Sequence, residues 1–137
     1  MSIDASHRAR FDGLLERVIA ALPERVAAVL EEVPVHVLDE PDERILADLG
    51  VPREHWEDER DSLCGLQTGH MLTERSIEDP ADLGTQIHLF RRGIAQVAGG
   101  WEADDATLRA EIQITLLHEL GHHFGLDEED LDQLGYA

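Results

Sequence analysis

The chain has 137 residues, the size of one domain, and its formal net charge of −19 is large for that length. So acidic a chain disfavours nucleic acid as a partner, because phosphate contacts need a basic surface. Its single cysteine, Cys64, excludes an internal disulfide and fits a reducing compartment. No segment approaches the roughly 20 apolar residues of a membrane span. We therefore expect one cytoplasmic domain over residues 1–137, with neither a membrane nor a nucleic-acid partner and with its oligomeric state left open.

The first third of the chain predicts three helices and one strand. Apolar residues that recur every three or four positions from Phe11 to Leu22 indicate an amphipathic helix. Pro23 then fits the first position of a second short helix. Residues 34–38 are typical of a short strand, and residues 41–49 of a short helix that Gly50 closes.

The middle of the chain predicts two more strands. Residues 52–61 are dense in charge, and we expect them to form a loop or a mobile segment. Strands are expected near Leu63–Thr68 and Gln86–Arg91, with a loop around residues 76–80 between them. The pair Gly99-Gly100 indicates a turn before the last long helix. Helices and strands in this order predict an α+β fold.

One long helix is expected over residues 106–124, with Asp104 or Asp105 as its N-cap. Positions four apart predict one buried stripe, which consists of Leu108, Ile112, Leu116, Leu120 and Phe124. Two further apolar residues, Ile114 and Leu117, lie on another side of this helix. A helix that is apolar on two sides is expected to pack centrally.

The same helix carries an HExxH motif, from His118 to His122. Two histidines four apart share one face of a helix, and both can bind one zinc ion at about 2.0–2.1 Å. Glu119 lies beside such an ion rather than on it, which is the place of a general base for the attacking water. HExxH alone is a weak signal, but a glycine three residues after the second histidine and an acid six after it make it far more specific.

A third zinc ligand is expected beyond Gly125, the residue at which the helix should end. If the helix continued, Glu128 would lie about 9 Å further along the axis than His122 and would point away from the metal. A turn at Gly125 instead lets Glu128 fold back as the third ligand. Asp127 is the alternative ligand, although it is also placed to be the N-cap of a short final helix. A ligand from elsewhere in the chain, or an incomplete site, is the remaining alternative.

With this motif the sequence resembles the minimal zincins, a family of small bacterial zincin-like metallopeptidases. The resemblance covers most of the chain and includes HELGHHFG, the acid-rich end with LDQLGY, and the segments around Leu66–Gly69 and Ile87–Arg92. It implies a single zincin-like domain, in which a short mixed sheet packs on an N-terminal helix and on the central HExxH helix. It also implies Zn²⁺ as cofactor and a peptide or protein as substrate.

Two features depart from related patterns. Aspartate is the usual final acid of the family motif, whereas Glu128 is one methylene longer, which affects the ligand geometry. True metzincins have a methionine turn after the motif, but the methionines of this chain are Met1 and Met71.

His88 is a candidate for substrate binding. It alternates with Ile87 and Leu89 in the expected strand, so its side chain faces away from theirs. In zincins a strand runs above the motif helix and can pair with an extended substrate, and His88 or its backbone could line that cleft. An ordinary exposed histidine is the simpler interpretation.

The sequence therefore predicts a zinc-dependent hydrolase, and a peptidase first, with His118, His122 and Glu128 on the metal and Glu119 as general base. One alternative is a non-catalytic or regulatory metal-binding module on the same scaffold. A metallo-endoribonuclease is disfavoured, because that family has a third histidine, has no counterpart of Glu119 and would be expected to have a basic surface.

Overall fold

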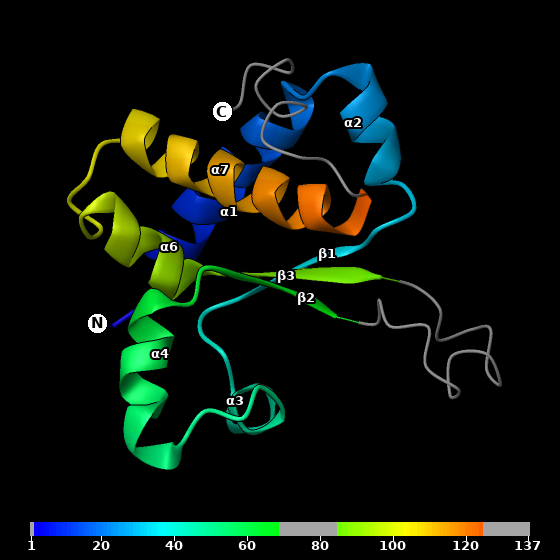
Figure 1. The fold of residues 1–137 in the computed structure, drawn as a ribbon. Coiled ribbons are helices and arrows are strands. Elements are labelled where there is room, and N and C mark those ends of the chain that lie inside the picture. The colour runs from blue at the N-terminus through cyan, green and yellow to red at the C-terminus, as the bar shows by residue number, and fades with distance from the viewer. Residues whose placement is uncertain (1, 69–84, 125–137) are drawn as a thin grey trace, which may run out of the picture.

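The computed structural model describes residues 2–68 and 85–124 (Figure 1). Side chains of the last helix are described as far as Gly121. The elements, in chain order, are α1 (Ala5–Ala20), α2 (Glu24–Val29), β1 (Val35–Leu38), α3 (Glu43–Asp48), the 3-10 helix η1 (Arg53–His55), α4 (Trp56–Ser62), β2 (Gly65–Thr68), β3 (Gln86–Phe90), α6 (Arg91–Ala98) and α7 (Asp105–Phe124). Helices packed on a small mixed sheet confirm the predicted α+β fold.

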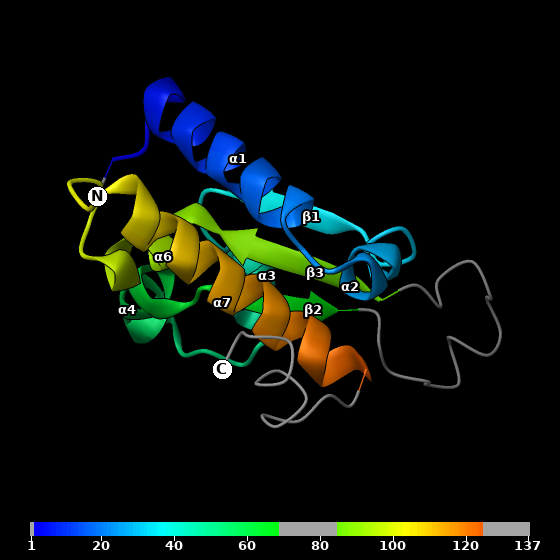
Figure 2. The same ribbon diagram turned by 90° about the horizontal axis from the view of Figure 1, so that it is seen from above.

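The three strands form one sheet in the order β1-β3-β2. β1 runs parallel to β3, with Val35 opposite Ile87, and β2 runs antiparallel to it, with Gly65 opposite Leu89. β3 is therefore paired on both sides, and β2 is an edge strand of the described sheet. α1 and α7 lie side by side over one face of the sheet (Figure 2), whereas α3 lies beyond the other face (Figure 1).

The main core lies between α1, α7 and the covered face of the sheet. Phe11 of α1 and Ile87 and Leu89 of β3 are fully buried in it. The predicted stripe of α7 is confirmed for its described members, each at most 2 % exposed: Leu108, Ile112, Leu116 and Leu120. The expected second apolar side is confirmed for Leu117, which is buried, but it is wrong for Ile114, which is 53 % exposed. α7 is therefore covered on one side and open on another.

Most predicted elements are confirmed with small shifts at their ends. Pro23 is the N-cap of α2 rather than its first helical residue. Asp104 is the N-cap of α7, since its carboxylate accepts a hydrogen bond from the Thr107 N–H at 2.8 Å. Gly99 ends α6 in the left-handed region, with φ +108°, so the glycine pair makes a turn. The loop expected around residues 76–80 lies outside the described residues.

The prediction for residues 52–61 was wrong, because they form η1 and α4 rather than a loop. Acidic residues in the first turn of α4 favour a helix through its dipole. The Trp56 indole N–H donates to the Val51 carbonyl oxygen at 2.8 Å. Arg92 of α6, itself 12 % exposed, pairs with Glu57 at 3.1 Å and with Asp61 at 2.9 Å. These ion pairs hold α4 against α6.

α6 is an unexpected helix that follows β3 without a loop. The expected strand ended at Arg91, which instead begins α6. Gly93 lets α6 approach the chain just before β2, because a Cβ at this position would overlap the carbonyl group of Leu63. The position of β2 therefore depends on a glycine in a different element.

No helix within residues 2–68 and 85–124 combines the length and hydrophobicity that a membrane crossing needs.

Candidate metal and active site

The HExxH motif lies in the last two turns of α7. The backbone is helical through Phe124, so His118 and His122 are one turn apart in a continuous helix, as predicted. The His118 side chain is exposed, and that of Glu119 is half-buried. The His122 side chain lies outside the described part, as do Glu128 and Asp127 and the expected helix end after Phe124.

The edge strand β2 crosses α7 at Glu119. A Cβ on Gly65 would lie 3.1 Å from Cγ of Glu119 and 2.9 Å from Cγ2 of Thr115. The backbone of β2 is therefore packed directly on the motif helix, and only glycine fits between them without displacing a side chain. The sequence analysis missed Gly65 and Thr115. A glycine at the start of a strand was the available signal, because such a glycine often marks a close approach.

Cys64, which directly precedes β2, shares this environment. Burial raises the pKa of the Cys64 thiol, and the negative charges of Glu111 and Glu119 raise it further. The thiol therefore stays protonated at neutral pH, whereas a nucleophile or metal ligand would be a thiolate. Cys64 is therefore better explained as a structural residue than as a nucleophile.

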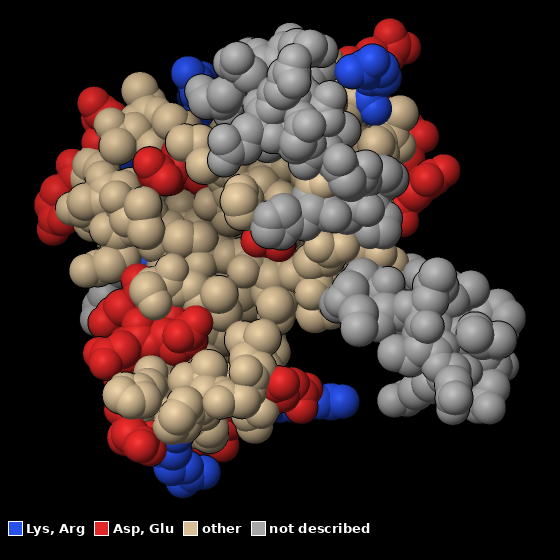
Figure 3. Space-filling view, viewed as in Figure 1, with Lys and Arg blue, Asp and Glu red and all other residues tan. Residues whose placement is uncertain are grey.

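Negative charge lies on the face of the molecule that carries the candidate site. Figure 3 shows the flank on which α7 and β2 lie, where Asp and Glu side chains gather around α4 and also appear between α7 and the sheet. Such a surface raises the local concentration of cations. It therefore favours a divalent metal ion and positively charged ligands over anionic ones.

The structure places His88 apart from the motif. It lies in the central strand β3, whose neighbours β1 and β2 pair with it on both sides. Its side chain points away from Ile87 and Leu89, which face α7, and its ring lies 5.2 Å from that of His36 in β1. His88 is therefore on the opposite face of the sheet from His118 and Glu119, and a role in substrate binding stays an untested prediction.

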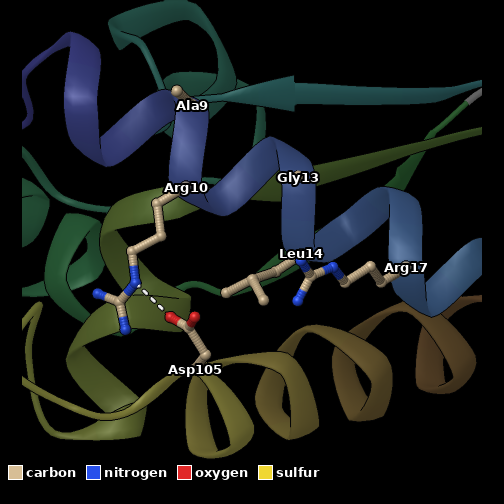
Figure 4. A pocket seen from close by; sticks show the side chains of 6 residues that line it. All are labelled: Ala9, Arg10, Gly13, Leu14, Arg17 and Asp105. Atoms are coloured by element: carbon tan, nitrogen blue, oxygen red, sulfur yellow. Dashed lines mark hydrogen bonds and ion pairs between the residues drawn. The ribbon is translucent and has the colours of Figure 1, made fainter.

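A pocket of about 240 Å³ lies at the other end of α7, against α1 (Figure 4). It is lined by Ala9, Arg10, Gly13, Leu14, Arg17 and Asp105. Arg10 is held there by Asp105 at 2.7 Å and by the carbonyl oxygen of Trp101 at 2.8 Å. These bonds connect α1 to the start of α7. The pocket is therefore the space between two packed helices, and its charged side chain Arg10 is already paired.

The donor chemistry of the motif fits zinc, although the described residues alone do not complete a site. The imidazole of His118 is accessible to solvent, and imidazole is a common zinc ligand. No set of three or more His, Cys, Asp and Glu side chains among residues 2–68 and 85–121 is arranged to hold a metal ion. The other side chains predicted to bind zinc, those of His122 and of Glu128 or Asp127, lie outside that range.

A long helix that carries HExxH beneath the edge strand of a small mixed sheet is the arrangement typical of zincins. The family model described as zincin-like metallopeptidase matches residues 30–136, and the chain belongs to this family. The match includes β1, β2, β3 and α7 but begins after α1 and α2. A search of curated proteins finds no match.

Proposed function

We propose that this protein is a zinc-dependent peptidase, in which His118, His122 and Glu128 hold the ion and Glu119 is the general base. Asp127 is the alternative third ligand. The observation that carries the proposal is the contact between β2 and α7, because it sets an edge strand beside Glu119. Membership of the zincin-like metallopeptidase family supports the same chemistry.

Glu119 would move a proton during peptide hydrolysis. Zinc, when bound, acidifies water and polarises a carbonyl group. Glu119 would accept the proton of the attacking water and return it to the leaving amine. Its half-buried position against Gly65 restricts its side chain, which helps to hold the carboxylate ready for both steps.

The substrate would be an extended peptide that pairs with the edge of β2. Such pairing uses backbone hydrogen bonds for affinity and side-chain pockets for specificity. Gly65 is the residue of β2 that packs against Glu119, so the scissile bond would lie beside it. The net charge of −19 favours peptides with basic side chains over nucleic acid. The lone cysteine supports action in the reducing cytoplasm.

Zinc content and turnover together test this function. Dialysed protein is expected to retain about one zinc ion per chain, and His118→Ala is expected to lose it, because two imidazoles form the core of the site. Elemental analysis gives the metal content, and a broad peptide library gives turnover. A zinc-loaded protein that cleaves nothing would instead be a metal-binding module without catalysis. A wild-type protein with no zinc affinity would exclude both the zinc peptidase and the metal-binding module.

The third ligand is tested by comparing two neighbouring acids. Glu128→Ala is expected to weaken zinc binding at least about tenfold, because it would remove a direct ligand. Asp127→Ala is expected to lower the free energy of unfolding by about 1 kcal/mol through loss of a helix cap. Competitive zinc titration of both variants measures the ranking. The reverse ranking would assign the ligand to Asp127, and no effect in either would place the ligand elsewhere.

Gly65→Ala tests the contact between β2 and the motif helix. The added methyl would press on the side chains of Thr115 and Glu119, so it is expected to move the general base. We expect kcat/KM to fall by about tenfold to 100-fold, since small misplacements of catalytic groups have effects of that size. The free energy of unfolding should fall by only about 1–3 kcal/mol. A folded variant with unchanged kcat/KM would show that β2 does not position Glu119.

A further inference from the structure

Two histidines lie next to each other on the sheet face away from α7. His36 of β1 and His88 of β3 are register partners in the parallel pair. Register partners on adjacent strands project to the same face, about 4.8 Å apart, so the backbone itself brings these rings together. The ring centroids are 5.2 Å apart and the ring planes are inclined by 32°.

One ring nitrogen of this pair lacks a hydrogen-bond partner. Nδ1 of His88 is buried and has no hydrogen-bond partner. Buried polar atoms in proteins are normally hydrogen-bonded, so this unpaired nitrogen calls for a ligand such as an ion or a water molecule. His36 is exposed, which leaves the pair open to solvent on one side.

The charge state of His88 suits a metal ion. Burial lowers the pKa of His88, His36 lowers it further, and Asp42 opposes the shift. His88 is therefore a neutral imidazole at pH 7, which is the form that binds metals. Asp42 is the N-cap of α3, where it accepts the Ile45 N–H at 2.8 Å, so it acts on His88 through its negative charge rather than as a ligand.

The ring separation matches a shared ion. A metal–nitrogen bond of about 2.0–2.1 Å places a metal ion about 3.2 Å from the centroid of each imidazole ring. Two rings bound to one ion at a tetrahedral angle would then have centroids about 5.2 Å apart. The observed separation of 5.2 Å is the separation expected for two imidazoles that share one ion.

We propose that His36 and His88 form a second metal site, which binds a divalent transition cation through one ring nitrogen of each residue. Water would complete the coordination, because no described acid or cysteine makes a third ligand with them. Ni²⁺, Cu²⁺ and Zn²⁺ have the required affinity for imidazole. The bound ion would link β1 to β3 behind the sheet, independently of the proposed peptidase site on α7.

Nickel titration of the full-length protein, loaded first with one equivalent of zinc, tests the site. Ni²⁺ is paramagnetic, so it broadens the NMR signals of the imidazoles that bind it. We expect the His36 and His88 signals to broaden together, and before that of His55, an exposed histidine of η1. Calorimetry should show that His36→Gln weakens Ni²⁺ binding at least about tenfold.

His55→Gln is the matched control, because it removes an exposed histidine that lies outside the pair, and its Ni²⁺ affinity should equal that of the wild type. Thermal unfolding shows whether each variant folds. The spectra of the wild-type protein show by themselves whether Ni²⁺ binds to His36 and His88. Broadening of His118 without His36 and His88 would overturn the proposal. Equal Ni²⁺ affinity in folded wild type and His36→Gln would overturn it as well.

Discussion

Glu119→Gln is expected to keep its zinc and to lose about 10²–10⁴-fold of its peptide cleavage rate. Glutamine has the shape of glutamate, so the packing against Gly65 is preserved. The amide cannot accept the proton of the attacking water, whereas the metal ligands are untouched. Elemental analysis and kcat/KM, measured on the same preparation, are expected to show an unchanged zinc content and a much lower activity.

Glu111→Gln is the control for this variant. Glu111 lies two turns before Glu119 in α7, is also half-buried, and its charge also acts on Cys64. Its replacement removes the same charge without removing the proposed base, so the rate should change little. Equal losses in the two variants would mean that a general charge effect, rather than proton transfer, explains the result. A wild-type rate in Glu119→Gln would mean that another group is the base.

Gly93→Ala is expected to lower the free energy of unfolding by about 3 kcal/mol or more. The new Cβ would overlap the carbonyl group of Leu63, and a backbone group cannot rotate away as a side chain can. Either α6 or the chain entering β2 would have to move. Urea unfolding followed by circular dichroism measures the loss.

Gly13→Ala gives the opposite expectation. Gly13 is exposed in α1, and a Cβ there would meet no atom within 4 Å. Alanine should therefore stabilise the protein by about 0.4–1 kcal/mol, because it restricts the unfolded chain and suits a helix. If Gly13→Ala and Gly93→Ala changed stability equally, the tight packing of α6 on Leu63 would be refuted.

The elements that the sequence predicts well have local signals. α1 and α7 have apolar residues at helical spacing, and Asp104 caps α7 from the adjacent position. The strands were found because short apolar runs end at turn residues. α4 lacked such a signal, since Trp56 is its one large apolar residue and its support comes from Arg92, which is distant in the sequence. α6 was not predicted, and the need for its Gly93 arises from Leu63, which is distant in the sequence.

The candidate site also has one part that local sequence signals predict and one part that depends on contacts between distant segments. The motif residues His118, Glu119 and His122 are found from spacing alone, because one helix carries them. The packing of Gly65 on Glu119 depends on the strand order β1-β3-β2. This order is set by pairings between segments that are far apart in the chain. Alternation correctly predicted that His88 faces away from Leu89. It could not show which face of the sheet α7 covers.

The pairing of α1 with α7 constrains how the protein can fold while it is being synthesised. Phe11 and Leu108 belong to one core cluster although about 100 residues separate them in the chain. The ribosome releases the apolar face of α1 early, and its partner helix emerges near the end. During that interval this face is exposed surface of the kind that aggregates or is bound by chaperones. A fragment that starts at residue 30, where the family match begins, would lack α1 and therefore one of the elements that cover the apolar stripe of α7.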